Sequence, residues 1–160
     1  MRYILLLAIF FYTIPSSGQT FLIKEGKLAD TITDPDLEYG SALPYYYSVG
    51  GKYPAGSATL LKEVQAFTEK QNNNYSGSGY ITFRFIIDTT GNMLPRVKVI
   101  ATDEHYKSHH FEKALINELF AYLKTLNKWR VAGMVPGKTW KYIAFITFKM
   151  KNGKVINIIP

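Results

Sequence analysis

Cysteine is absent from all 160 residues, and several signatures of catalysis are absent with it. Without thiols, the chain can have no disulfide framework, no thiol nucleophile, no thiolate-bound metal and no lipid on an N-terminal cysteine. It also lacks the Gly-x-Ser-x-Gly elbow of hydrolases, a phosphate-cradling glycine loop and the His-Glu-x-x-His zinc motif. We therefore expect a protein that is not an enzyme and has no cofactor.

Runs of like charge are also absent. The chain has 19 Lys and Arg against 12 Asp and Glu, a net charge of +7, but the lysines are scattered along it. Scattered lysines are typical of a solvated surface, whereas a nucleic-acid site needs clustered cations. We expect no nucleic-acid partner.

The apolar run over residues 3–14 is about a dozen residues long, too short for a membrane span of roughly 20. Arg2 precedes this run, and Pro15 and then small residues follow it, which is the pattern of a secretory signal. We expect residues 1–18 to be a signal peptide, with an uncleaved anchor as the alternative. The protein would then be periplasmic or secreted, with no stable membrane span after cleavage.

Residues 19–52 show little periodicity, and we interpret them as an N-terminal arm that is ordered only in part. Residues 20–23 could form a short strand. Tyr45–Tyr47 are three consecutive tyrosines that either pack on the domain or form a sticky surface. The second alternative would suit an oligomeric or surface-associated structural protein.

The clearest pattern is a hairpin over residues 79–102. Apolar residues alternate along 79–88 and a second β-rich run covers 93–102, with a polar turn at Gly91 and Asn92 between them. Such alternation gives a sheet with one strongly apolar face, which helices must cover. Pro95 cannot donate to a ladder, so it predicts an edge position or a bulge.

Helices and further strands are predicted on both sides of this hairpin. Ser57 is the expected N-cap of a helix ending near Gln71, and Ser108 that of a longer helix reaching about residue 126. Trp129 is expected to close one end of the core. The remaining expected elements are a third strand over 139–150, an Asn-Gly turn and a last strand over 155–159. This predicts an α+β domain over 53–160, a small antiparallel sheet of three to four strands packed against two helices, in the order helix-strand-strand-helix-strand-strand.

The order and spacing of several motifs resemble the TonB C-terminal domain family, and its stand-alone exported members most closely. The resemblance covers about residues 50–160. It is carried by Tyr53-Pro54-Ala55-Gly56, Phe83-Arg84-Phe85-Ile86-Ile87-Asp88, Val97-Lys98-Val99, Lys128-Trp129 and Pro136-Gly137.

This resemblance implies a non-enzymatic module of the Gram-negative envelope, associated with transmembrane transport. Family members bind a short segment of an outer-membrane transporter by adding it as a strand to a sheet edge. Here the implied partner is such a transporter or another envelope protein. The last strand would be the binding edge, with site residues Val155, Ile156, Asn157 and Ile158. The 7 prolines are dispersed and form no spacer, so we expect binding and not force transmission.

A different function is suggested by the segment His105–His110, which contains all three histidines. Histidines four apart can share a metal on a helix, but Ser108 as N-cap would leave His105 in the preceding loop. A small metal-binding or enzymatic exported domain that uses this segment is therefore the alternative interpretation. The simpler interpretation is that these residues are solvated side chains at the start of a helix and have no specific function.

Overall fold

The structure is a computed structural model, and it describes residues 20–24, 27–29, 43–135 and 137–160. The expected signal peptide lies outside the described residues. The helices are the 3-10 turn η1 (Tyr46–Ser48), α2 (Ser57–Gln71) and α3 (Lys113–Leu123). The strands are β1 (Thr20–Lys24), β2 (Lys27–Ala29), β3 (Gly79–Ile87), β4 (Met93–Thr102), β5 (Ala132–Val135), β6 (Lys138–Trp140), β7 (Tyr142–Lys151) and β8 (Lys154–Ile159).

The fold is α+β, an antiparallel sheet covered by helices, as the sequence predicts. Six strands form the main sheet in the order β2-β1-β4-β3-β7-β8, and β5 and β6 form a separate small hairpin. The sheet is wider than expected because β1 pairs with β4, placing Phe21 opposite Val99. Strands β1 and β2 of the N-terminal arm thus belong to the main sheet.

The central hairpin β3–β4 confirms the predicted strands at 79–88 and 93–102 to within a residue. Cross-strand pairing is regular from Tyr80–Thr102 to Phe85–Val97, and it resumes at Ile87–Met93. Between these last two pairs β4 has two more residues than β3. Of the two alternatives predicted from Pro95, the structure has the bulge and not the edge position, since β4 lies between β1 and β3.

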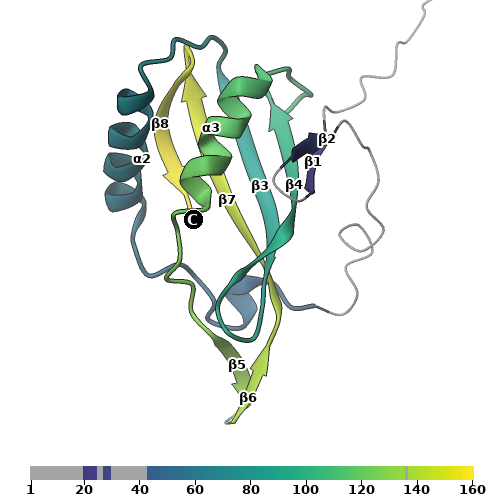
Figure 1. The fold of residues 1–160 in the computed structure, drawn as a ribbon. Helices are drawn as coiled ribbons and strands as arrows, with labels where there is room; N and C mark the ends of the chain where they lie inside the picture. The colour runs from purple at the N-terminus through teal and green to yellow at the C-terminus, as the bar shows by residue number, and fades with distance from the viewer. Residues whose placement is uncertain (1–19, 25–26, 30–42, 136) are drawn as a thin grey trace, which may run out of the picture.

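Both helices lie on the apolar face of the sheet, with α3 across its middle and α2 beside β8 (Figure 1). The core side chains of β3 alternate with half-buried ones, as period-two patterning requires. The ring of Phe83 contacts those of Phe120 on α3 and Phe148 on β7, at centroid distances of 6.2 and 5.7 Å. Trp129 closes the end of this core, as predicted, between Tyr53 and Phe85.

Two predicted helix starts are wrong. Helix α2 begins at Ser57 itself, and its N-cap is Gly56. Helix α3 begins only at Lys113, after Glu112, and not at Ser108. Ser108 instead forms a bridge with Thr102, and the backbone N–H of His109 donates to the carbonyl oxygen of Ala101. Sheet pairing therefore competes with the local capping signal of Ser108 and prevails.

The C-terminal strands also differ in one detail from expectation. The single strand predicted over 139–150 is divided at Lys141 into β6 and β7, because β6 turns away to pair with β5. The predicted turn between β7 and β8 is confirmed: Asn152 and Gly153 have φ angles of 49° and 73°, as a type I′ turn requires. Gly153 is obligatory here, since a Cβ would lie 2.0 Å from the carbonyl oxygen of Tyr75.

Candidate functional site

The predicted binding strand, β8, lies at one edge of the main sheet. It pairs with β7 on one side, and the other side faces α2 (Figure 1). Pairing runs from Lys151–Lys154 to Thr147–Ile159, with an irregularity between Lys149 and Met150. The structure therefore places Val155, Ile156, Asn157 and Ile158 together on an edge strand.

These four residues divide into two classes by burial. Val155 and Ile158 belong to the hydrophobic core, and Ile158 is 0% exposed. Asn157 is exposed, Ile156 is 40% exposed, and the next residue, Ile159, is 50% exposed. Apolar side chains exposed on an edge strand are a surface onto which another chain can be added. The exposed part of the candidate site is therefore Ile156, Asn157 and Ile159.

Side chains already bond to two backbone groups of β8. The Nε2 of Gln65, on α2, donates to the carbonyl oxygen of Val155 at 2.9 Å. The backbone N–H of Ile158 donates to the Oδ1 of its neighbour Asn157, also at 2.9 Å. Such bonds satisfy backbone groups that another strand would otherwise use, and they protect an edge from uncontrolled pairing. A segment that adds to β8 must replace them.

A polar cavity of about 360 Å³ lies at the start of β8, where α2, the Asn72–Asn74 link and the β7–β8 turn meet. Glu118, the buried acidic residue of α3, faces this region. Its Oε2 accepts hydrogen bonds from Asn73 Nδ2 and Tyr75 OH, both at 2.8 Å. Burial, and then the hydrogen bond to Glu118, raise the pKa of Tyr75 to about 12. This network fixes the link between α2 and β3, and so holds α2 against β8.

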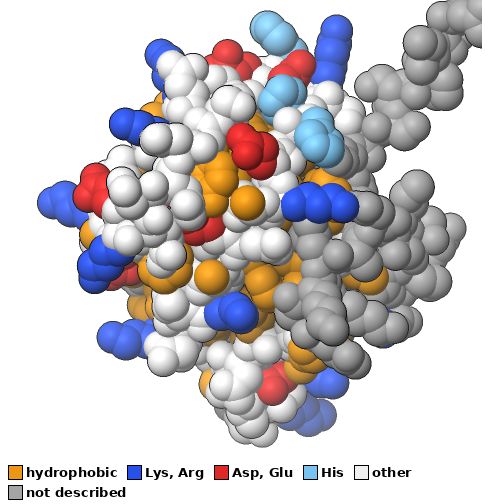
Figure 2. All heavy atoms as spheres, turned by 45° about the horizontal axis from the view of Figure 1, so that its top comes forward, with side chains coloured by type: hydrophobic (Ala, Val, Ile, Leu, Met, Phe, Trp, Pro, Cys, Tyr) orange, Lys and Arg blue, Asp and Glu red, His pale blue; other side chains and the backbone are white. Residues whose placement is uncertain are grey.

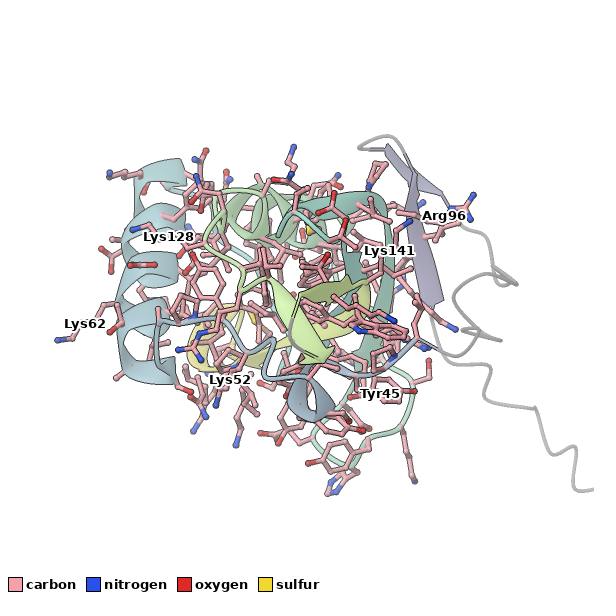
Figure 3. The ribbon with its side chains drawn as sticks, turned by 90° about the horizontal axis from the view of Figure 1, so that it is seen from below. Tyr45, Lys52, Lys62, Arg96, Lys128 and Lys141 are labelled. Carbon is pink, nitrogen blue, oxygen red and sulfur yellow. The ribbon has the colours of Figure 1, made fainter. Side chains whose placement is uncertain are left out.

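The tyrosine cluster Tyr45–Tyr47 packs on the sheet face opposite the helices. The rings of Tyr45 and Tyr46 contact Phe145 at 5.6 and 6.0 Å, and Tyr47 stacks on Tyr45 at 5.5 Å. The carbonyl oxygen of Pro44 accepts the N–H of Ile143, so this segment extends the sheet beyond the end of β8. Seen from below, Tyr45 lies on the side away from α3 (Figure 3). Packing, the first of our two interpretations, therefore accounts for Tyr46 and in part for Tyr45, which is 36% exposed, whereas Tyr47 is 67% exposed.

The segment His105–His110 forms a loop ahead of α3. The Oδ1 of Asp103 accepts the backbone N–H groups of His105 and Lys107, both at 2.8 Å. The hydrogen bond from Lys107 is the main reason why the pKa of Asp103 is lowered. The ring of His109 packs edge-on against Phe111 at 4.7 Å. Nowhere in the described part of the chain do three or more potential metal ligands gather.

Cationic side chains do not collect into one patch on the face shown in Figure 2, where lysines and arginines are scattered singly or in small groups. Lys62, Arg96 and Lys128 likewise come from different elements (Figure 3). This distribution agrees with a solvated basic surface.

Sequence reasoning missed Gln65 and Glu118 because both lie on helical positions that look merely polar. Their partners, Val155 and Tyr75, are 90 and 43 residues away in the chain. A signal for Glu118 was present nonetheless: it is a carboxylate within the apolar stretch Lys113–Leu123, where an interior charge needs partners.

Among the residues that the structure describes, no helix is long and apolar enough to cross a membrane. Comparison with known proteins finds no matching family model, no matching curated protein and no matching solved structure.

Proposed function

We propose that this protein is an exported, non-enzymatic binding module that takes up an extended segment of another envelope protein by β-strand addition at β8. The observation that carries the proposal is the edge strand itself, which exposes Ile156 and Ile159 at 40% and 50%. The signal-like residues 1–18 and the resemblance to the TonB C-terminal domain family support an envelope partner, such as an outer-membrane transporter. An added strand would gain backbone hydrogen bonds from the edge and specificity from these side chains.

Helix α2 makes this edge selective. Pairing with β8 is favourable only for a segment that replaces two existing hydrogen bonds. These are the bond that Gln65 donates to the Val155 carbonyl and the bond that Asn157 accepts from the Ile158 N–H. Any strand that adds to β8 must first give up these two bonds, which reduces what arbitrary chains gain by pairing there. In this proposal, the two bonds keep the edge from pairing with arbitrary chains, and the partner is recognised through Ile156 and Ile159.

A photo-crosslinking experiment in the host tests the proposal. A benzophenone amino acid replaces Ile156 in one variant and Ile100 in a matched control. Ile100 is an isoleucine of similar exposure, 36%, on the interior strand β4. We expect position 156 to crosslink to one envelope protein, through a single short segment, and position 100 to give no such product.

The crosslinked segment, made as a peptide, then provides the second measurement. Its binding should slow hydrogen exchange of the β8 amides and leave those of β1 unchanged. Equal crosslinking at positions 156 and 100, or protection that is confined to other strands, would rule out β8 as the binding edge.

A further inference from the structure

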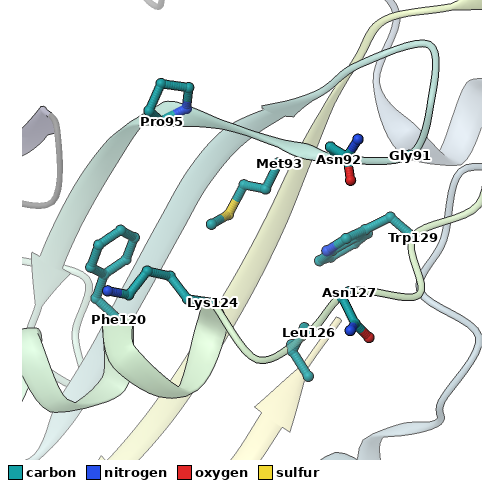
Figure 4. Close-up of a pocket in the computed structure, with 9 residues that line it drawn as sticks. All are labelled: Gly91, Asn92, Met93, Pro95, Phe120, Lys124, Leu126, Asn127 and Trp129. Atoms are coloured by element: carbon teal, nitrogen blue, oxygen red, sulfur yellow. The ribbon is translucent and has the colours of Figure 1, made fainter.

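A second cavity lies at the C-terminal end of α3, where Phe120 and Lys124 line it. It is enclosed by the β3–β4 loop, the end of α3 and the segment that leads to Trp129 (Figure 4). Its volume is about 360 Å³, within the range of small-molecule pockets, roughly 300–1,000 Å³. The β4 bulge at Pro95 forms part of its wall, so the extra residues of β4 help to keep this space open.

Trp129 gives the cavity a hydrogen-bond donor for which the described residues supply no acceptor. The side chain is only 7% exposed, and its Nε1 is buried without an acceptor among the described residues. Contacts with Tyr53 at 4.8 Å and Phe85 at 5.1 Å hold the ring in place. Figure 4 shows the edge of the ring with the nitrogen turned into the cavity. A buried donor that lacks a partner is costly, and a ligand acceptor placed here would remove that cost.

The other side of the cavity carries a positive charge. Lys124 is exposed at the rim, and its Nζ lies 5.2 Å from the ring centroid of Phe120. In Figure 4, Lys124 and Trp129 lie on opposite sides of the cavity, with the apolar side chains of Met93 and Leu126 between them. None of the described residues that line the cavity is acidic. The lining therefore favours an anionic group at one end and an uncharged acceptor at the other.

We infer that this cavity is a binding site for a small organic anion with an apolar body. The negative charge of the ligand lies beside Lys124, the apolar body contacts Met93, Phe120 and Leu126, and an oxygen at the far end accepts from Trp129 Nε1. The ring of Phe120 sets the position of the Lys124 ammonium through a cation–π contact. This site is separate from β8 and does not depend on the proposed function.

The loop that forms one wall is rigid, which supports a preformed site. Asp88 Oδ1 accepts from the N–H and Oγ1 of Thr90 and from the N–H of Asn92, at 2.7 to 2.9 Å. Gly91 has a φ of 86°, and a Cβ there would lie 2.9 Å from the carbonyl oxygen of Trp129. The β3–β4 hairpin and the Trp129 segment are thus in contact at Gly91, which fixes this wall of the cavity.

The test titrates the purified protein with 4-acetylbenzoate, which carries a carboxylate and a carbonyl acceptor at opposite ends of an apolar ring. 4-Ethylbenzoate is the matched probe without the acceptor. Binding is followed by the indole N–H resonance of Trp129, assigned with a Trp140→Phe variant that leaves Trp129 as the only tryptophan. We expect 4-acetylbenzoate to move this resonance and 4-ethylbenzoate to bind about tenfold more weakly.

Two lysine variants test whether the carboxylate of the ligand binds beside Lys124. Lys124→Met should weaken binding of 4-acetylbenzoate by about two- to fivefold, as expected for a partly solvated ion pair, and leave binding of uncharged 4-acetylbenzamide unchanged. Lys128→Met removes the same charge from a lysine that does not line the cavity, and it should have no effect. Equal binding of the two benzoates, or a Trp129 resonance that does not move, would overturn the proposal.

Discussion

The side chain of Gln65 bonds to the backbone of Val155: a helix thereby closes part of a sheet edge. The hydrogen bond measures 2.9 Å and joins α2 to β8 across 90 residues of sequence. It links a side chain of the helix to a backbone group of the predicted binding strand. The effect of removing it therefore bears on both stability and partner binding.

Gln65→Ala should have opposite effects on these two properties. Loss of one part-buried hydrogen bond lowers the free energy of unfolding by about 1 kcal/mol. The same change frees the Val155 carbonyl, so affinity for an added strand should rise. Urea unfolding and titration with the crosslinked peptide measure the two effects. The control is Gln71→Ala, an exposed glutamine of the same helix, which should change neither. If Gln65→Ala destabilises the protein but leaves peptide affinity unchanged, the partner does not use the Val155 carbonyl.

Asp88 makes part of the stability dependent on pH. Its hydrogen bonds, chiefly that from the Thr90 side chain, lower the pKa of this carboxyl in the folded state. A group with a lowered folded-state pKa contributes stability above its unfolded pKa, and this contribution is lost as the pH falls through the folded-state pKa. We expect the acid limb of unfolding, measured by urea denaturation at a series of pH values, to be shallower in Asp88→Asn.

The control for Asp88→Asn is Glu104→Gln, which removes one negative charge from an exposed loop residue. It should leave the acid limb nearly as steep as in the unmodified protein. Equal flattening by both variants would assign the effect to net charge and not to the Asp88 turn.

Glu118→Gln tests whether the buried carboxylate controls Tyr75. The glutamine keeps an oxygen that can accept from Tyr75, but it removes the negative charge. The hydrogen bond to Glu118 and its charge both help raise the pKa of Tyr75, so the variant should lower that pKa from about 12 towards its ordinary value. Exchange of a charged for a neutral acceptor should also cost about 1 kcal/mol of stability.

Spectrophotometric titration of tyrosine, with Tyr75→Phe to identify the signal, measures this shift. Glu112→Gln is the control, because Glu112 is an exposed carboxylate whose charge affects Tyr75 least. A pKa of Tyr75 that is the same in Glu118→Gln as in the unmodified protein would show that burial alone raises it.

Local patterns predicted the sheet well, because there the local and tertiary preferences agree. The alternation along β3 and the Asn152-Gly153 turn each depend on neighbours in sequence, and both are confirmed. Ser108 shows the opposite case. Its local signal favoured a helix start, but Ser108 pairs with Thr102 in a β-bridge instead. Helix α3 therefore starts five residues after Ser108.

The candidate site was predictable only in part for the same reason. An apolar last strand after an Asn-Gly turn places Val155–Ile158 at a sheet edge, and the structure has them there. Which of them face the core depends on the register of β8, which an irregularity beside Met150 shifts. The contribution of α2 depends on contacts 90 residues apart, which no local pattern encodes.

Two isoleucines of β8 separate the structural role of this strand from its proposed binding role. Ile158 is 0% exposed and Ile156 is 40% exposed, two positions apart on the same strand. Ile158→Ala removes core volume and should lower the free energy of unfolding by about 2–5 kcal/mol. Ile156→Ala should cost less than about 1 kcal/mol, because its side chain loses little buried area.

Partner binding should show the reverse order. Ile156→Ala should lower the affinity for the crosslinked peptide severalfold. Ile158→Ala, assayed under conditions in which this variant remains folded, should bind the peptide nearly as well as the unmodified protein does. Deletion of all of β8 would not make this distinction, since Val155 and Ile158 belong to the core and their loss would unfold the domain. Unfolding curves and peptide titrations of the two point variants provide the comparison. If Ile156→Ala binds the peptide unchanged, β8 is a structural strand and the partner contacts another surface.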